Sequence, residues 1–230
     1  MGGHSMRRLN RQFFTQPTLD VARSLIGCVL VHVTRAGKMS GTIVETEAYI
    51  GEDDPACHAS SGLTKRNKLM YGTPGYAYIY LNYGIHHLLN VVTEPRGVPA
   101  AVLIRALVPL EGIPGMQRRR QRARNSRTRL AEHELCRGPG NLTRALGIDL
   151  RQNGLNLCGA QLHVESGMSR FETIGWSGRV GIRVGTDRNW RCFALDQVAV
   201  SKPMTGVTIS GHPAAPEQYA PRSQINRHPE

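Results

Sequence analysis

Alternating side chains mark the segment Ile43-Val44-Glu45-Thr46-Glu47-Ala48-Tyr49 as a β-strand. Successive residues of a strand point to opposite faces, so Glu45, Glu47 and Tyr49 share one face. Such alternation is typical of any half-buried antiparallel strand with a solvated face. The alternative is that two carboxylates and an aromatic ring on one face form a site, in which a flat base stacks beside a group that activates an attack.

Segments on both sides of this strand predict an antiparallel sheet. The apolar run 28–33 and the strand 41–49 flank the turn 35–38 and predict a hairpin. A second hairpin is predicted for strands 76–81 and 88–92, because Asn82-Tyr83-Gly84 suits a tip. Tyrosines at alternate positions of the first of these strands are most often sheet core or cross-strand pairs. The other expected elements are a strand over 100–108, short strands between 157 and 200, and helices over 18–25, within 109–136 and ending near 146.

Positive charge is the strongest compositional signal in this chain of 230 residues. Lys and Arg number 29 against 17 Asp and Glu, which gives a formal net charge of +12 and a pI near 10.1. Such an excess most often serves a polyanion, through release of counterions from phosphates. A nucleic acid is therefore the expected partner. A membrane is not expected, because no run approaches the roughly 18 apolar residues that a spanning helix needs.

The length suits one large domain, which we place over residues 7–203. Residues 1–6 resemble a cloning remnant, and residues 204–230 are predicted to be a polar, Pro-containing tail. We see no linker and no internal repeat that divides the chain. The N-terminal segment has no signal-peptide pattern, which predicts a cytosolic protein.

The cysteines are scattered, number five and form no Cys-x-x-Cys pair. A disulfide framework or a zinc cluster is therefore not expected, and no metal site is predicted. Cys57 and His58 are adjacent, but neighbours in an extended chain point apart and no second group of ligands accompanies them. His58 lies in the segment 51–67, which is rich in Gly, Ser, Asp and Pro and predicts a long loop of the kind that often carries function.

Arginines crowd the helical stretch expected after residue 109. A run of like charges is usually a solvated face. With a single nearby acid, Glu132, the guanidinium groups would repel one another, and a phosphate would relieve that repulsion. Both interpretations are open. The candidates for contact with a nucleic-acid backbone are Arg118, Arg119, Arg120 and Arg122.

Several motifs follow one another along the chain. They are Val-Glu-Thr-Glu-Ala-Tyr at 44–49, His58, Tyr-x-x-Tyr-Gly at 80–84, Asn90, Val-Leu-Ile-Arg-Ala-x-x-Pro-Leu-Glu-Gly at 102–112 and Gly-Pro-Gly-Asn-Leu at 138–142. In this order they resemble the alkyladenine (3-methyladenine) DNA glycosylase family, with similarity from roughly residue 13 to residue 201. The resemblance implies an α+β fold: a single mixed domain around a curved antiparallel β-sheet with a protruding β-hairpin and flanking helices.

The resemblance also implies a catalytic pair. Glu47 takes the place of the general base, and Arg105 takes that of the arginine that helps to hold the attacking water. The segment before Arg105 is slightly longer than in the family and carries Pro95 and Pro99. Chemistry agrees with a carboxylate in this role, because cutting an N-glycosidic bond needs an activated water on one side of C1′ and a stable leaving base on the other.

The same resemblance implies a base pocket and a DNA wedge. Tyr49 and His58 take the places of residues that sandwich the extruded base, and Tyr80 that of a residue at the pocket edge. Asn90 takes the place of a residue that crowds the position of the guanine amino group. Tyr83 takes that of a residue that wedges into the minor groove. A stacked base is out of reach, so it must be flipped out, and aromatic stacking at about 1–3 kcal/mol per base repays part of that cost.

The predicted function is that of a monofunctional DNA glycosylase in base excision repair. It would flip alkylated or deaminated purines, such as 3-methyladenine and hypoxanthine, out of duplex DNA and hydrolyse the N-glycosidic bond. The expected partner is double-stranded DNA with a damaged purine, and the protein is expected to act as a monomer without a cofactor. The expected location is the cytoplasm or nucleoid of a bacterium, or the nucleus of a eukaryote.

Two other functions are open. A bifunctional glycosylase that also cuts the strand through a Schiff base needs an amine near the base, and Lys65 and Lys68 are the nearby lysines. A DNA-damage binding protein without activity would keep Tyr83 and the arginines but would not need Glu47. The presence of both Glu47 and Arg105 argues against this second alternative.

Overall fold

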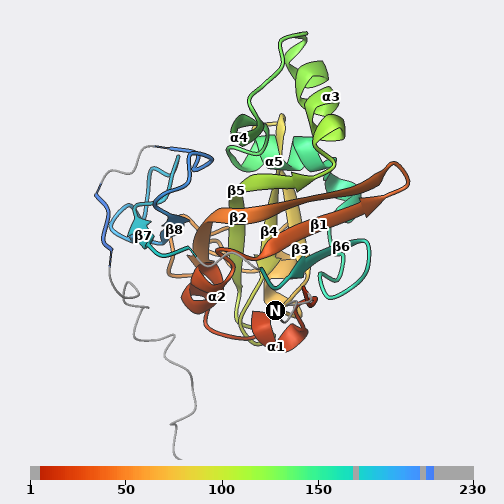
Figure 1. Ribbon diagram of the computed structural model, residues 1–230. Coiled ribbons are helices and arrows are strands. Elements are labelled where there is room, and N and C mark those ends of the chain that lie inside the picture. Colours follow the sequence, from red (N-terminus) through yellow and green to blue (C-terminus); the bar gives the residue numbers. More distant parts are fainter. Residues whose placement is uncertain (1–5, 168–170, 203–205, 210–230) are drawn as a thin grey trace, which may run out of the picture.

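The computed structural model describes residues 6–167, 171–202 and 206–209, and its centre is a curved antiparallel sheet (Figure 1). Six strands follow one another in the order β3-β4-β5-β2-β1-β6, while β8 joins β2 and β7 pairs with β8. All these strand pairs are antiparallel. The strands are β1 (Val29–Thr34), β2 (Gly37–Ile50), β3 (Ala77–Asn82), β4 (His86–Val92), β5 (Ala100–Glu111), β6 (Leu162–Glu165), β7 (Ile174–Ser177) and β8 (Arg191–Ala194).

The long strand β2 connects the parts of this sheet. Its first residues pair with β1, and its residues 45–47 pair with β8. Against β5 the register shifts between Ile43 and Thr46, and such bulges bend a strand and increase its twist. The strand therefore bends directly before Glu47. The predicted α+β class and curved antiparallel sheet are confirmed.

Both predicted hairpins are present. In the first, Thr34 pairs with Gly37, so the turn is reduced to Arg35 and Ala36. In the second, β3 and β4 pair from Ala77↔Val91 to Asn82↔His86, which leaves residues 83–85 as the tip. This β3–β4 hairpin is the protruding hairpin that the family resemblance implies.

The helices lie at two ends of the sheet (Figure 1). α1 and α2 lie together at one end, and α3, α4 and α5 lie at the other. The α-helices are α1 (Arg11–Phe14), α2 (Thr18–Ser24), α3 (Ile113–Arg124), α4 (Glu132–Leu135) and α5 (Pro139–Leu146), and the 3₁₀ turns are η1 (Lys68–Tyr71) and η2 (Leu150–Gln152). No helix in these described ranges is long and apolar enough to cross a membrane.

Two predicted helix starts need correction. The stretch from residue 109 is not helical at first, because β5 continues to Glu111 and α3 begins at Ile113. Gly112 makes the change of direction with a φ of +79°, and a Cβ there would lie 2.6 Å from the Lys38 carbonyl oxygen. Only glycine fits such a position without strain. The sequence predicts a loop over 137–142 before the next helix, but α5 already begins at Pro139, a residue type whose fixed φ and missing N–H suit the first helical position.

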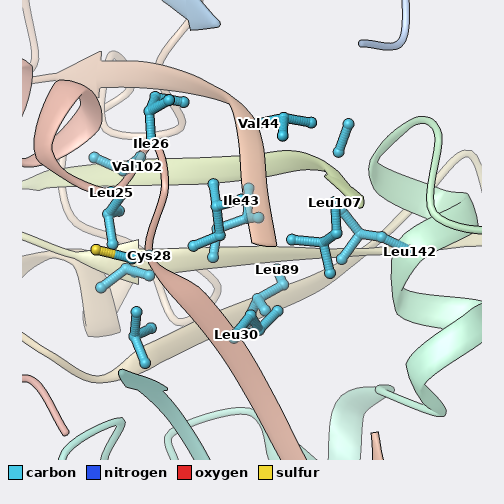
Figure 2. Packing of buried hydrophobic residues seen from close by; sticks show 14 of the residues in the cluster. Leu25, Ile26, Cys28, Leu30, Ile43, Val44, Leu89, Val102, Leu107 and Leu142 are labelled. Carbon is cyan, nitrogen blue, oxygen red and sulfur yellow. The ribbon is translucent and has the colours of Figure 1, made fainter. Parts of the chain in front are cut away.

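A large apolar core fills the space between the sheet, α2 and α5, and a smaller apolar cluster lies around Tyr78 and Met70. Figure 2 shows side chains of this core, among them Leu25 of the α2 end, Ile43 of β2, Leu107 of β5 and Leu142 of α5. All five cysteines are free thiols, and four of them are buried while Cys158 is half-buried. Burial raises the pKa of Cys57 to about 12, so this thiol stays protonated and does not act as a nucleophile beside His58.

The predicted domain limits fall at the edges of the described structure. Met6 is the first described residue, so the expected cloning remnant lies otherwise outside the described residues. Of the predicted tail, only residues 206–209 are described, and Trp176 pairs there with Thr208 through two main-chain hydrogen bonds. The limits of 7 and 203 stay predictions.

Candidate active site

Glu47 lies on β2, fully buried beside β5 and β8. Its Oε2 accepts hydrogen bonds from Tyr49 Oη at 2.8 Å and Arg105 Nη1 at 3.1 Å, and its Oε1 accepts one from the Val180 main-chain N–H at 2.6 Å. An ionised carboxylate has about four acceptor positions, so Oε1 keeps one for a water molecule. The reading of this strand face as solvated is wrong, since Glu45 is also fully buried.

Glu45 has a different environment from Glu47. Its Oε1 accepts from Arg105 Nε at 3.0 Å, Arg191 Nε at 2.7 Å and Ser201 Oγ at 2.9 Å, and its Oε2 accepts from the Ser201 N–H at 2.7 Å. Burial alone would raise the pKa of Glu45, but Arg105 and Arg191 outweigh it and the pKa lies below its usual value. Glu45 thus stays ionised and fixes Arg105, whose Nη1 reaches Glu47.

Tyr49 contacts both the candidate base and a second buried ion pair. Burial and the neighbouring Glu47 raise the pKa of Tyr49 well above its ordinary value, so its hydroxyl stays a donor. The guanidinium of Arg179 lies 4.8 Å from the Tyr49 ring centroid. Arg179 is held in turn by Asp54, at 2.5 and 2.7 Å, and by the Ala48 carbonyl at 3.1 Å. Two contacts therefore fix the orientation of the Tyr49 ring: the hydrogen bond from its hydroxyl to Glu47 and the guanidinium of Arg179 over one of its faces.

Aromatic and polar side chains close around a small cavity next to Tyr49. The His58 and Tyr80 ring centroids are 4.4 Å apart, and His58 Nδ1 lies 2.8 Å from Tyr78 Oη. Asn90 lines the same cavity and donates through Nδ2 to the Tyr78 carbonyl at 3.0 Å. The cavity measures about 20 Å³, so rings must move apart before a purine can enter.

The environment of His58 keeps this ring neutral. Burial, together with the nearby Arg66, lowers the pKa of His58 to about 4. The imidazole is therefore uncharged at neutral pH. A neutral ring can stack on a cationic base without charge repulsion.

An open cleft of about 500 Å³ connects these residues with the tip of the β3–β4 hairpin. Tyr49 and Arg105 line it, as do Tyr83 and His86 of the hairpin and residues 180–182. Tyr83 is 85% exposed and adopts a φ of +48°, so its ring projects from the tip toward solvent. The predicted wedge thus stands at the mouth of a cleft that is lined by Tyr49 and Arg105, the two side chains that donate to Glu47.

The candidate backbone arginines fall into two groups. Arg118 and Arg122 are exposed on α3, as the prediction requires. Arg119 is half-buried, with Nη1 2.9 Å from Met39 Sδ. Arg120 is 6% exposed and donates to the main-chain carbonyls of Glu134 and Leu135, which does not fit the predicted contact with DNA.

Several residues around Glu47 were missed by the sequence analysis. Glu45 was recognised on the shared strand face, but the support that it gives Arg105 was not. The signal that could have indicated this support is the position of Glu45 two residues before Glu47, which places both carboxylates on the same strand face within reach of one arginine. The other supporting groups leave no local pattern. Asp54 lies in the loop directly after β2, and the rest come from far along the chain: Tyr78, Arg179, Val180, Arg191 and Ser201.

This arrangement can perform acid–base chemistry on a flat substrate. A buried carboxylate with one free acceptor position can take a proton from water, and the rings beside it can stack on a base. No group of three His, Cys, Asp or Glu side chains suited to a metal ion occurs among residues 6–167, 171–202 and 206–209.

Comparison with known proteins relates most of the chain to DNA glycosylases. A model of the methylpurine-DNA glycosylase family matches residues 12–198. A protein of Chlorobium phaeobacteroides (strain BS1), named "Putative 3-methyladenine DNA glycosylase", is 46% identical over 206 residues, which cover 87% of this chain and 98% of that protein. Proteins with the same name from Prosthecochloris aestuarii (48% over 199 residues, 86% and 92% covered) and Methanocella arvoryzae (46% over 202 residues, 86% and 98% covered) are also similar.

Proposed function

The chain belongs to the methylpurine-DNA glycosylase family, and we propose that it hydrolyses the N-glycosidic bond of damaged purines such as 3-methyladenine and hypoxanthine in duplex DNA. One observation carries the proposal. A fully buried carboxylate, Glu47, is oriented by three hydrogen bonds, keeps one acceptor position, and lies beside rings that can receive a base.

Glu47 acts as the general base. A water molecule held by Glu47 Oε1 loses its proton to the carboxylate while its oxygen attacks C1′ of the nucleotide. The bond between C1′ and the base nitrogen breaks, and its electron pair leaves with the base. Arg105 holds Oε2, so that the carboxylate presents Oε1 to the water.

The base is bound by stacking. Tyr49 and His58 receive its two faces, and Tyr80 forms the edge of the pocket. Because His58 is neutral at neutral pH, a cationic alkylated purine stacks on it without repulsion. The electron pair of the broken bond neutralises the positive charge of an alkylated purine, so this base leaves as a neutral molecule and needs no proton from the protein.

The rest of the molecule holds the duplex. Tyr83 enters the minor groove and fills the place of the flipped nucleotide, while exposed arginines of α3 such as Arg118 and Arg122 contact phosphates. We propose that the protein does this as a monomer wherever the genome lies: the cytoplasm or nucleoid of a bacterium, or the nucleus of a eukaryote.

A strand-cutting lyase is a weaker candidate for this site. Lys65 in the loop and Lys68 at the start of η1 are exposed, and they line neither the small cavity nor the open cleft. Borohydride trapping on damaged duplex separates the two mechanisms. A lyase leaves a covalent adduct with DNA, and a hydrolase leaves none.

The variant Glu47→Gln tests the proposed mechanism. It keeps the shape of the side chain but cannot accept a proton, so single-turnover release of hypoxanthine should fall at least 100-fold, in line with general-base contributions of about 10²–10⁴. Affinity for the same duplex should stay within a few-fold. Glu172→Gln, at an exposed carboxylate before β7, is the matched control and should leave both unchanged. Near-normal release by Glu47→Gln would end the proposed mechanism.

A further inference from the structure

A second, larger cleft lies on the other face of the β3–β4 hairpin. It measures about 810 Å³ and is bordered by the ends of β1, α3 and α5, which gather at the same end of the sheet (Figure 1). His86 and Leu88 line the cleft with the candidate active site, whereas Ile85 and His87 line this second cleft. Successive strand residues point to opposite faces, so the hairpin is a wall shared by the two clefts.

The second cleft is strongly basic, and we call it the basic cleft. Its charged side chains are Arg35, Arg119, Arg144, Arg151 and a single carboxylate, Asp149. Asp149 is already bound by Arg151, at 2.8 to 3.1 Å. Within the described parts of the chain, no ion pair involves Arg35, Arg119 or Arg144. Three guanidinium groups therefore share one hollow without a counter-charge, and such a hollow favours a polyanion.

A buried histidine gives a second, independent sign of a ligand. His32 lines the basic cleft and is 1% exposed. Its Nδ1 lies 2.9 Å from the Leu146 carbonyl oxygen and so carries the hydrogen, which makes Nε2 an acceptor. Nε2 is buried and has no hydrogen-bond partner among the described residues. A water molecule that bridges Nε2 and a phosphate oxygen would satisfy both, because it donates to each.

We propose that the basic cleft binds backbone phosphates of the undamaged DNA strand. The inference rests on the proposed function, in which Tyr83 enters the minor groove. The two strands of a duplex then flank the hairpin, one on each face. The damaged strand must lie on the face of Glu47 to deliver its base, so the undamaged strand lies on the face of the basic cleft, where Arg119 and Arg144 meet its phosphates.

The test compares two variants with equal loss of charge. Arg35→Gln/Arg144→Gln removes two guanidinium groups from the basic cleft. Arg8→Gln/Arg96→Gln removes two exposed ones elsewhere, and Arg96 lies in the loop that follows the far end of β4. Binding of a hypoxanthine duplex is measured against salt. The cleft variant should show a shallower slope, by about 0.9 for each phosphate that the protein no longer neutralises, and the control variant should keep the original slope.

A second measurement identifies the strand. Methylphosphonate groups, which carry no charge, replace phosphates near the lesion in one strand at a time. With the unchanged protein, neutralising the undamaged strand should weaken binding, and with the cleft variant it should have a smaller effect, since the partner side chains are gone. Equal effects on both proteins would overturn the proposal. So would a cleft variant that loses binding of inorganic phosphate, followed by NMR, but keeps its response to the undamaged strand, because the cleft would then serve a free phosphate.

Measuring the release of hypoxanthine distinguishes a failure of this inference from a failure of the proposed function. Hypoxanthine release by the unchanged protein, measured in the same samples at saturating concentration, reports on the function alone. Release at a normal rate together with an unchanged salt slope in the cleft variant would reject the cleft and keep the function. Absence of release by the unchanged protein would reject the function instead. The thermal midpoints of the two variants show that both are folded.

Discussion

Glu45 and Glu47 are two positions apart on one strand, yet their partners give them different roles. Glu45 accepts four hydrogen bonds, three at Oε1 and one at Oε2, and two of them come from arginines. Glu47 accepts three and keeps one. The same residue type on the same face thus supplies one carboxylate that fixes an arginine and one that can bind water.

Asn90 is expected to exclude guanine. Guanine differs from hypoxanthine only by an amino group, and a side chain that occupies the place of this group rejects one and admits the other. Asn90→Ser opens that space, so slow release of normal guanine from undamaged duplex should rise several-fold while hypoxanthine release is largely kept. The variant also loses the bond to the Tyr78 carbonyl, which should lower the free energy of unfolding by about 1 kcal/mol.

Guanine release and the unfolding midpoint are measured on both proteins. Ser40→Ala, a loss of a buried hydroxyl on β2 outside the base cavity, controls for lost stability. No gain in guanine release, with hypoxanthine release intact, would place the selection elsewhere, for example in the loop 51–67.

Local pattern predicted one part of the site and missed the other. Glu47, Tyr49 and Asn90 belong to short motifs, and strand alternation is sufficient to place the first two on one face. Val180 donates to Glu47 across 133 residues of sequence, and Arg191 reaches Glu45 across 146. Contacts between such distant segments depend on how the sheet curves, and no periodicity of either segment records that.

The elements were predicted best where their limits have a local cause. The β3–β4 hairpin ends at Tyr83 and Gly84, which both adopt positive φ, and Asn-x-Gly sequences are typical of such turns. The start of α2 has no cap of this local kind, because Pro17 precedes the helix and makes no side-chain hydrogen bond. The Thr18 N–H donates instead to the Glu94 carboxylate at 2.6 Å, from a loop 76 residues away.

The hairpin makes its own prediction, because its tip is exposed. Tyr83 is 85% exposed, so Tyr83→Ala should change the free energy of unfolding by no more than about 0.5 kcal/mol. Affinity for a hypoxanthine duplex should fall roughly tenfold, since stacking is worth about 1–3 kcal/mol per base. Val198→Ala, which truncates a side chain that is 70% exposed and lines neither cleft, is the control. Unchanged affinity of the Tyr83 variant would show that the hairpin tip does not enter the duplex.

At the scale of the whole molecule, buried charge connects segments that lie far apart in the sequence. Glu45 of β2 binds Arg105 of β5, Arg191 of β8 and Ser201, and thereby joins the C-terminal strands to the centre of the sheet. Its depressed pKa means that its contribution to stability is complete above the unfolded-state value and is lost as pH falls through the folded-state value. Acid should therefore begin to weaken the whole sheet as pH falls below the ordinary Glu value of about 4.3.

A separate loss of stability is expected at higher pH from His58. The pKa of His58 falls from its usual 6.5 to about 4 in the folded protein, because of burial and Arg66. The unfolded chain takes up the proton first, so stability is full above pH 6.5 and declines as pH falls from 6.5 to 4. His32, whose pKa is also lowered, adds to the same decline.

The variant His58→Gln cannot take up this proton in either state, so the decline between pH 6.5 and 4 should become shallower while the loss below pH 4 remains. Urea midpoints measured at half-unit steps of pH give both slopes for each protein. His133→Gln, at a half-buried histidine of α4 outside the base cavity, makes the same change of residue type and serves as the control. If His58→Gln and the unchanged protein decline in parallel, His58 is solvated and protonates freely, and its stacking on a cationic base at mildly acid pH would then meet charge repulsion.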